Sequence, residues 1–337
     1  MGNMIQIKVD AYAHISPPKY TEVLKRDYPG FYNNMLVGGV PLYDMDTRFR
    51  IMDRYNLVQV LTVGPVPSLE AFAPPDKSPD LAKMANDEMA ELSLKYRDRF
   101  IAAIALLPMN NIDAAMKEAD RAINDLGFRG IYVHSNINGK PLDAPEFWPL
   151  WEKMAQYNLP VYIHPWRPDS FADYSTETES KYAIAGTFGW PYETTVAMTR
   201  IVFSGILEKY PNLKVVTHHC GGMVPYYEQR IVQHYGMRDR GNRSNYVTRL
   251  SKAPVDYYKM FYNDTAIHGN TPALMLAYNF WGPDHIVLGA DMPLGDYYWG
   301  FRSYRQTINA IEAMDIPETD KQKIFSENAI KLLRLAV

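Results

Sequence analysis

Side chains able to bind a metal ion or move a proton lie at the ends of short apolar segments spread along the chain. They are Tyr12 and His14 in IQIKVDAYAH, His164 in LPVYIH, the pair His218–His219 in LKVVTHH, and Asp291 in HIVLGAD. Imidazole nitrogens and carboxylate oxygens are ligands of zinc and similar divalent ions. A parallel barrel brings the carboxyl ends of its strands to one mouth. The pattern therefore indicates a metal-dependent enzyme.

Some of these residues admit two roles. Tyr12 and His14 are two positions apart on an expected strand, so both side chains lie on one face and can reach one ion. A phenol with a pKa near 10 must ionise to bind strongly, which a metal could force, so Tyr12 is either a ligand or a neutral tyrosine packed by the site. His218 and His219 should point to opposite sides of an extended backbone, so we expect only one to face the mouth. Asp291 is expected to be a ligand or a general base, with a cap of the next helix as the alternative.

Three further residues are weaker candidates. His134 also ends an apolar segment, GIYVH, but Ser135 and Asn136 follow it and indicate a polar turn, so we expect a structural or supporting role. Arg48 and Arg50 lie in RFRIMD on an expected helix. One of these guanidinium groups could hold a substrate carboxylate through its planar donors, while the other is expected on the helix surface.

The elements between these residues alternate between strand-like and helical patterns from end to end. Eight candidate strands can be counted, the number that closes a (β/α)8 barrel. One expected helix, NIDAAMKEADRAINDLG, has a start signal at Asn111 and a stop signal at Gly127. No composition break divides the chain, so we predict a single domain over residues 1–337. Segments 28–44 and 166–189 are expected to be insertion loops of the kind that cover substrates.

The composition excludes several classes of protein. The chain has 337 residues, 47% of them hydrophobic, and a net charge of −3. Without a basic surplus, neither nucleic acid nor an anionic membrane is an expected partner. We find no apolar segment long enough to span a membrane and no signal peptide, so we expect a cytoplasmic protein. The single cysteine, Cys220, excludes an intrachain disulfide and is expected to be a buried filler.

Several motifs, taken in order, resemble a known family. VDAYAHISP, VYIHP, HHCGGMVPYYEQRI, IVLGADMP and IFSENAIKLL are similar to segments of the amidohydrolase-2 group of the amidohydrolase superfamily. That group contains aminocarboxymuconate-semialdehyde, γ-resorcylate and 5-carboxyvanillate decarboxylases. The resemblance covers essentially the full chain, and it implies a distorted (β/α)8 TIM barrel, an α/β fold, that holds one divalent ion.

The resemblance also implies a set of metal ligands. The family pattern D-x-H-x-H corresponds to a segment in which Tyr12 replaces the first histidine and His14 matches the second. His164 matches the ligand on the fifth strand, and Asp291 matches the ligand on the eighth strand. The replacement at Tyr12 implies a retuned metal, a weaker site or a protein that has left the family's chemistry.

Other roles follow from the same resemblance. The family's acid/base histidine lies six residues before a proline, which places it at His219 before Pro225. Arg48 and Arg230 match arginines that hold the substrate carboxylate in the semialdehyde decarboxylase, where the second comes from the neighbouring subunit. We therefore expect a homodimer or a higher homo-oligomer, since such a site requires at least two copies.

The leading hypothesis is a non-oxidative decarboxylase of a small aromatic or unsaturated carboxylic acid. The metal would orient substrate oxygens, Arg48 and Arg230 would hold a carboxylate, and His219 with Asp291 would move the proton. A metal-dependent hydrolase of an amide, lactone or C–C bond is the alternative, and a barrel that binds a ligand without turnover is the third hypothesis. Two nitrogens and one oxygen favour zinc, with manganese as the other compatible ion.

Overall fold

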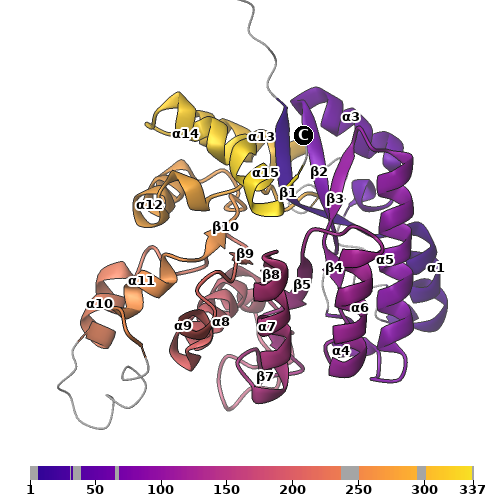
Figure 1. Ribbon diagram of the computed structural model, residues 1–337, viewed down its shortest axis with the longest axis horizontal. Coiled ribbons are helices and arrows are strands. Elements are labelled where there is room, and N and C mark those ends of the chain that lie inside the picture. Colours follow the sequence, from indigo (N-terminus) through magenta and orange to yellow (C-terminus); the bar gives the residue numbers. More distant parts are fainter. Residues whose placement is uncertain are drawn as a thin grey trace, which may run out of the picture.

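The parallel strands of the computed structural model lie at the centre of the molecule, with helices around them (Figure 1). The structure describes residues 7–30, 32, 39–64, 68–236, 250–293 and 301–335. The central strands are β1 (Lys8–Ile15), β2 (Leu57–Val63), β3 (Phe100–Ala103), β4 (Ala105–Leu106), β5 (Ile131–His134), β8 (Val161–His164), β9 (Val215–Thr217) and β10 (Tyr262–Asn263).

These strands close into a barrel. Hydrogen bonds join them in the orders β1–β2–β3 and β4–β5–β8–β9–β10, and β3 and β4 are parts of one strand because only Ile104 separates them. Residues 286–288 fill the remaining gap, since Ile286 forms a parallel bridge with Asn263 of β10 and the amide of Ala11 in β1 donates to the carbonyl of Leu288 at 2.8 Å. Within the described residues this completes the predicted α/β barrel.

Helices connect the strands and cover the outside of the barrel (Figure 1). The longer ones are α1 (Pro18–Asp27), α3 (Met45–Tyr55), α5 (Ser78–Lys95), α6 (Ile112–Asn124), α7 (Trp148–Tyr157), α8 (Trp190–Ser204), α10 (Glu228–Gly236), α12 (Thr271–Trp281) and α13 (Phe301–Glu312). Shorter ones are α4 (Leu69–Phe72), α9 (Ile206–Lys209), α11 (Pro254–Tyr258), α14 (Glu318–Gln322) and α15 (Asn328–Leu333). None of the helices in the described ranges is both long and apolar enough to span a membrane.

Local sequence signals explain where individual helices begin and end. The side chain of Asn111 accepts a hydrogen bond from the amide of Ala114 at 3.2 Å and so caps α6. Past the end of this helix the chain turns at Gly127, whose φ of 74° suits a residue without a Cβ atom. Asp44 caps α3 in the same way by accepting from the amide of Thr47 at 2.6 Å. The predicted start and stop signals are therefore confirmed for α6.

Aromatic and imidazole rings form successive layers inside the barrel. Tyr132 pairs in register with Tyr162, and His134 pairs with His164 two residues further on, so these four side chains share one face of the sheet. The Tyr12 ring packs against this face, with its centroid 5.0 Å from that of Tyr162 and 6.3 Å from that of Tyr132. The tyrosines thus fill the barrel, and the histidines lie above them at the carboxyl ends of the strands.

The two predicted insertion loops are described to different extents. Residues 31 and 33–38 of segment 28–44 lie outside the described residues. Segment 166–189 follows β8 and ends in a π-helical turn, Ala185–Gly189, that leads into α8. A small antiparallel hairpin of β6 (Asn136–Ile137) and β7 (Lys140–Pro141) follows β5. A substrate-covering role for either loop, and a single domain over the whole chain, stay predictions.

Candidate metal centre

Four buried side chains with metal-binding atoms meet at the carboxyl end of the barrel. His14 on β1, His164 at the end of β8, His218 after β9 and Asp291 after segment 286–288 each offer one ligand atom, and these atoms lie within 4.8 Å of one another. The three histidines are fully buried and Asp291 is 3% exposed. Within the described residues, the structure thus brings together His14, His164 and Asp291, which were predicted as ligands, and adds His218, which the sequence argument counted among the possible metal-binding side chains without assigning it as a ligand.

The rings of His14 and His164 are held in the orientation that a metal ligand needs. Nδ1 of His14 lies 3.2 Å from the hydroxyl oxygen of Thr62, and Nδ1 of His164 lies 2.8 Å from the carbonyl oxygen of Pro165. Nε2 of each ring is buried without a hydrogen-bond partner among the described residues. A hydrogen bond at one ring nitrogen leaves the other free to bind a metal. Nε2 of His14 also lies 3.3 Å from Oδ1 of Asp291. These two buried nitrogens therefore fit the predicted divalent ion.

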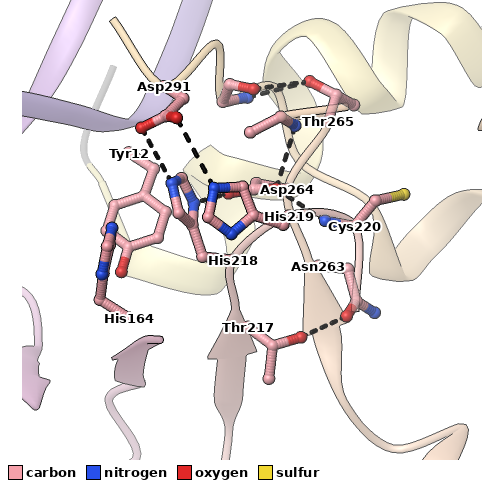
Figure 2. Close-up of polar contacts among 12 residues, drawn as sticks. Tyr12, His164, Thr217, His218, His219, Cys220, Asn263, Asp264, Thr265 and Asp291 are labelled. Atoms are coloured by element: carbon pink, nitrogen blue, oxygen red, sulfur yellow. Dashed lines mark hydrogen bonds and ion pairs between the residues drawn. The ribbon is translucent and has the colours of Figure 1, made fainter. Parts of the chain in front are cut away.

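Asp264, at the end of β10, holds the third ring (Figure 2). One of its carboxylate oxygens contacts Nδ1 of His218, and the other accepts the amides of Cys220 at 3.1 Å and Ala266 at 3.0 Å. Nε2 of His218 lies 3.1 Å from Oδ1 of Asp291. A carboxylate that fixes an imidazole facing a metal is a recurrent arrangement in metal sites. Sequence reasoning missed Asp264, although it too follows an apolar strand.

The prediction that only one of the two adjacent histidines faces the site is wrong. Nε2 of His219 lies 3.6 Å from Oδ2 of Asp291, and Figure 2 shows both imidazoles beside this carboxylate. The physical reason is that β9 ends at Thr217, while His219 and Cys220 have φ values of 55° and 53°. The alternation of side chains in an extended strand does not continue through this left-handed turn.

His219 is more accessible than the four clustered residues. It is 8% exposed, and its ring stacks against the half-buried Trp190 with centroids 6.2 Å apart and planes at 28°. Its Nδ1 has no hydrogen-bond partner among the described residues. An imidazole beside a carboxylate, with one free nitrogen, is suited to accept or deliver a proton.

The electrostatics of the cluster favour an ionised carboxylate. Burial opposes the charge of Asp291, yet His218, His14 and His219 hold the pKa of this carboxyl well below its usual range. Burial likewise opposes the charge of His218, but Asp264 and Asp291 raise the pKa of this imidazole to about 10. Binding of an ion at Nε2 displaces the proton from that nitrogen.

Tyr12 lies beside the cluster as a neutral phenol. Burial, and then the neighbouring tyrosines and carboxylates, raise the pKa of Tyr12 well above its usual value. Its hydroxyl is buried without a partner among the described residues. Figure 2 shows this oxygen at the far end of the ring from Asp291, and the ring centroid lies 4.3 Å from that of His218. These observations favour the packing role over the ligand role.

Replacing Tyr12 by phenylalanine is therefore expected to leave metal affinity unchanged. The substitution keeps the ring that packs on His218 and removes only an oxygen that has to ionise at a free-energy cost before it can bind an ion. Competition with a chromogenic chelator measures the affinity. Tyr162→Phe is a matched control, because its hydroxyl is also buried and unpartnered among the described residues. A large loss of affinity in the Tyr12 variant alone would show that the phenol is a ligand.

Arg48 occupies a buried position next to the cluster rather than an exposed one. Its Nε donates to the side-chain oxygen of Gln59 at 2.7 Å, and its Nη1 donates to the carbonyls of His14 at 2.7 Å and Pro41 at 3.1 Å. Burial lowers the pKa of its guanidinium to about 10. These bonds tie α3 to the end of β1. The arginine thus supports the backbone of a candidate ligand, while its Nη2 is buried without a hydrogen-bond partner among the described residues. That Arg48 holds a substrate carboxylate stays a prediction.

Arg230, the other predicted carboxylate-binding arginine, is exposed on α10. It lines a groove of about 500 Å³ together with residues of α8, α10 and α11. None of the four clustered residues lines this groove. Within the described part of one chain, Arg230 therefore lines a different part of the structure from the histidine cluster.

Comparison with known proteins identifies similar chains over the full length. A family model described as amidohydrolase matches residues 9–335. The 2-amino-3-carboxymuconate-6-semialdehyde decarboxylase of Dictyostelium discoideum is 29% identical, over 98% of this chain and 92% of that protein. The γ-resorcylate decarboxylase of Polaromonas sp. is 30% identical, over 86% of this chain and 87% of that protein.

A solved structure extends the similarity to three dimensions. It is a dihydroxybenzoic acid decarboxylase from Polaromonas sp. with bound manganese and the inhibitor 2-nitroresorcinol. It aligns with a TM-score of 0.80 at 26% identity and covers 98% of this chain and 97% of that one. The resemblance inferred from the sequence motifs is thereby confirmed.

Proposed function

Since the chain belongs to the amidohydrolase family, we propose that it is a metal-dependent, non-oxidative decarboxylase of a small aromatic or unsaturated carboxylic acid. The observation that carries this proposal is the cluster of three imidazoles and one carboxylate, in a chain whose full-length relatives are decarboxylases. The chain has the ligands for one divalent ion and, in His219, a further group able to move a proton.

His14, His164, His218 and Asp291 would hold the ion. There it would bind and polarise substrate oxygens. Three imidazoles with one carboxylate are typical of zinc, so we expect zinc, with manganese as the alternative because a related decarboxylase binds it. The Nδ1 contacts with Thr62, Pro165 and Asp264 fix the rings for this purpose.

The proton that replaces carbon dioxide would come from His219. Decarboxylation breaks the bond between the ring carbon and the carboxylate carbon, leaves the electron pair on the ring carbon, and forms a C–H bond there. Nε2 of His219 lies 3.6 Å from Oδ2 of Asp291, so the carboxylate can stabilise the charged imidazole before it gives up its proton. The ring lies beside that of Trp190, with the centroids 6.2 Å apart.

The test of this function is a panel of aromatic acids, including γ-resorcylate, with matched lactones and amides. Metal-loaded protein is expected to release carbon dioxide from at least one acid and to leave the lactones and amides intact. Chromatography and carbon dioxide detection measure the two outcomes. Hydrolysis products without carbon dioxide would instead support the metal-dependent hydrolase.

We further expect a homodimer or a higher homo-oligomer in which Arg230 serves the neighbouring site. Arg230 is exposed and lines a groove apart from the cluster. Tyr226, which precedes α10, is 74% exposed, so we expect a second copy to pack against this region. Light scattering is expected to give at least a dimer. Arg230→Ala is expected to raise KM and to change the metal content little. Full activity from a protein that is only monomeric would remove Arg230 from the mechanism.

A further inference from the structure

We propose that His134 is a substrate-binding residue, which donates a hydrogen bond from its Nδ1–H to the carboxylate of the aromatic acid. The inference rests on the proposed function and adds a recognition role to a histidine outside the metal cluster. It differs from the structural or supporting role expected from the polar residues after His134.

The position of His134 places it beside the metal centre. It pairs in register with His164 at the ends of β5 and β8, and the two ring centroids lie 5.8 Å apart. It is not among the four residues whose ligand atoms converge. Its ring also lies 6.3 Å from that of Trp166, which is half-buried. A carboxylate held next to His164 would therefore come within reach of His134.

The hydrogen bonding of this imidazole leaves one donor available. The hydroxyl of Tyr132 lies 3.4 Å from Nε2 of His134, and within the described residues this is the only hydrogen bond that the imidazole makes. A phenol has a single O–H, and a neutral imidazole carries its proton on one nitrogen and accepts at the other. Either group could donate in this contact, and the proposed tautomer is the one in which Tyr132 donates to Nε2 and the imidazole proton resides on Nδ1. This N–H is the group that we assign to the substrate.

The arginines near the site bond largely within the protein or lie apart from the cluster. Arg48 is fully buried, with Nε and Nη1 bonded within the protein and Nη2 buried without a hydrogen-bond partner among the described residues. Arg167, next to Trp166, has its Nη1 3.3 Å from a carboxylate oxygen of Glu193. Arg230 lines a groove that includes none of the clustered residues. Among the described residues of one chain, the N–H of His134 is thus a donor beside the cluster that no protein acceptor uses.

The experiment compares two probes on the metal-loaded protein by titration calorimetry. One is 2-nitroresorcinol, whose nitro group has the shape and the two oxygen acceptors of a carboxylate, and the other is resorcinol, which lacks that group. His134→Ala is expected to weaken binding of 2-nitroresorcinol about tenfold, the effect of losing one hydrogen bond, and to leave resorcinol binding and metal content unchanged. His134→Gln, which retains an N–H donor, is expected to recover most of the affinity.

Three outcomes would overturn the inference. Unchanged binding of both probes, or equal weakening of both, would show that His134 does not recognise the carboxylate position. Loss of metal in His134→Ala would show a role in the metal site. Should the alanine variant fail to fold, His134→Phe provides the same comparison with the ring volume kept. If the wild-type protein binds neither probe and releases no carbon dioxide from any acid of the panel, the proposed function itself fails, which is distinct from an effect of the substitution.

Discussion

Replacing His164 by alanine is expected to remove the metal ion and the activity together. The ring is fully buried, its Nδ1 is held by the carbonyl of Pro165, and its Nε2 has no hydrogen-bond partner among the described residues. It therefore has no evident use other than as a ligand. The loss of affinity should exceed the roughly 10–100-fold that loss of a residue supporting a ligand causes. Elemental analysis of the purified variant measures the metal per chain.

A control variant tests whether removing a histidine outside the cluster has the same effect. His268 is exposed and lies outside the cluster, so His268→Ala should keep wild-type metal content and turnover. Circular dichroism should show that the His164 variant is folded. Full metal occupancy in folded His164→Ala protein would contradict the assignment of the site.

The adjacent histidines are expected to fail in different ways when each is changed to asparagine. His219→Asn should keep the metal and lose turnover by roughly 10²-fold or more, the usual contribution of a general acid or base. His218→Asn should weaken metal binding first, because Nε2 of His218 belongs to the converging set and Asp264 holds its Nδ1. Excess metal should then restore part of the activity of the His218 variant only.

Metal titrations and turnover at saturating metal distinguish the two variants. An Asp264→Asn variant is a useful companion, since it keeps His218 and weakens only the group that orients it. It should behave as a milder form of His218→Asn. Metal loss in the His219 variant with normal binding in the His218 variant would reverse the roles assigned to the two rings.

Much of the barrel could be predicted because its strands and helix caps are specified by short segments of the sequence. Each strand is a short apolar segment, and the residues at its carboxyl end mark the mouth, so His14, His164 and Asp291 could be placed together from position alone. The cap at Asn111 depends only on residues within one turn and was predicted for the same reason.

The remaining features depend on contacts between distant segments. Asp264 acts on His218 across 46 positions of the chain, and Arg48 reaches the carbonyl of His14 across 34. No local pattern reports such partners. The prediction that His218 and His219 point to opposite sides was wrong because it continued the strand alternation past Thr217, where the backbone becomes left-handed. The neutral state of Tyr12 follows from its complete burial.

The central claim, that this metal centre removes carbon dioxide and returns a proton to carbon, has a direct test. Metal-loaded protein is incubated in deuterium oxide with the acid of the panel that it consumes, and the product is analysed by mass spectrometry and proton NMR. The account predicts one molecule of carbon dioxide per product and one deuterium at the carbon that carried the carboxylate. A product that retains its carboxylate, or contains added water without carbon dioxide release, would contradict it.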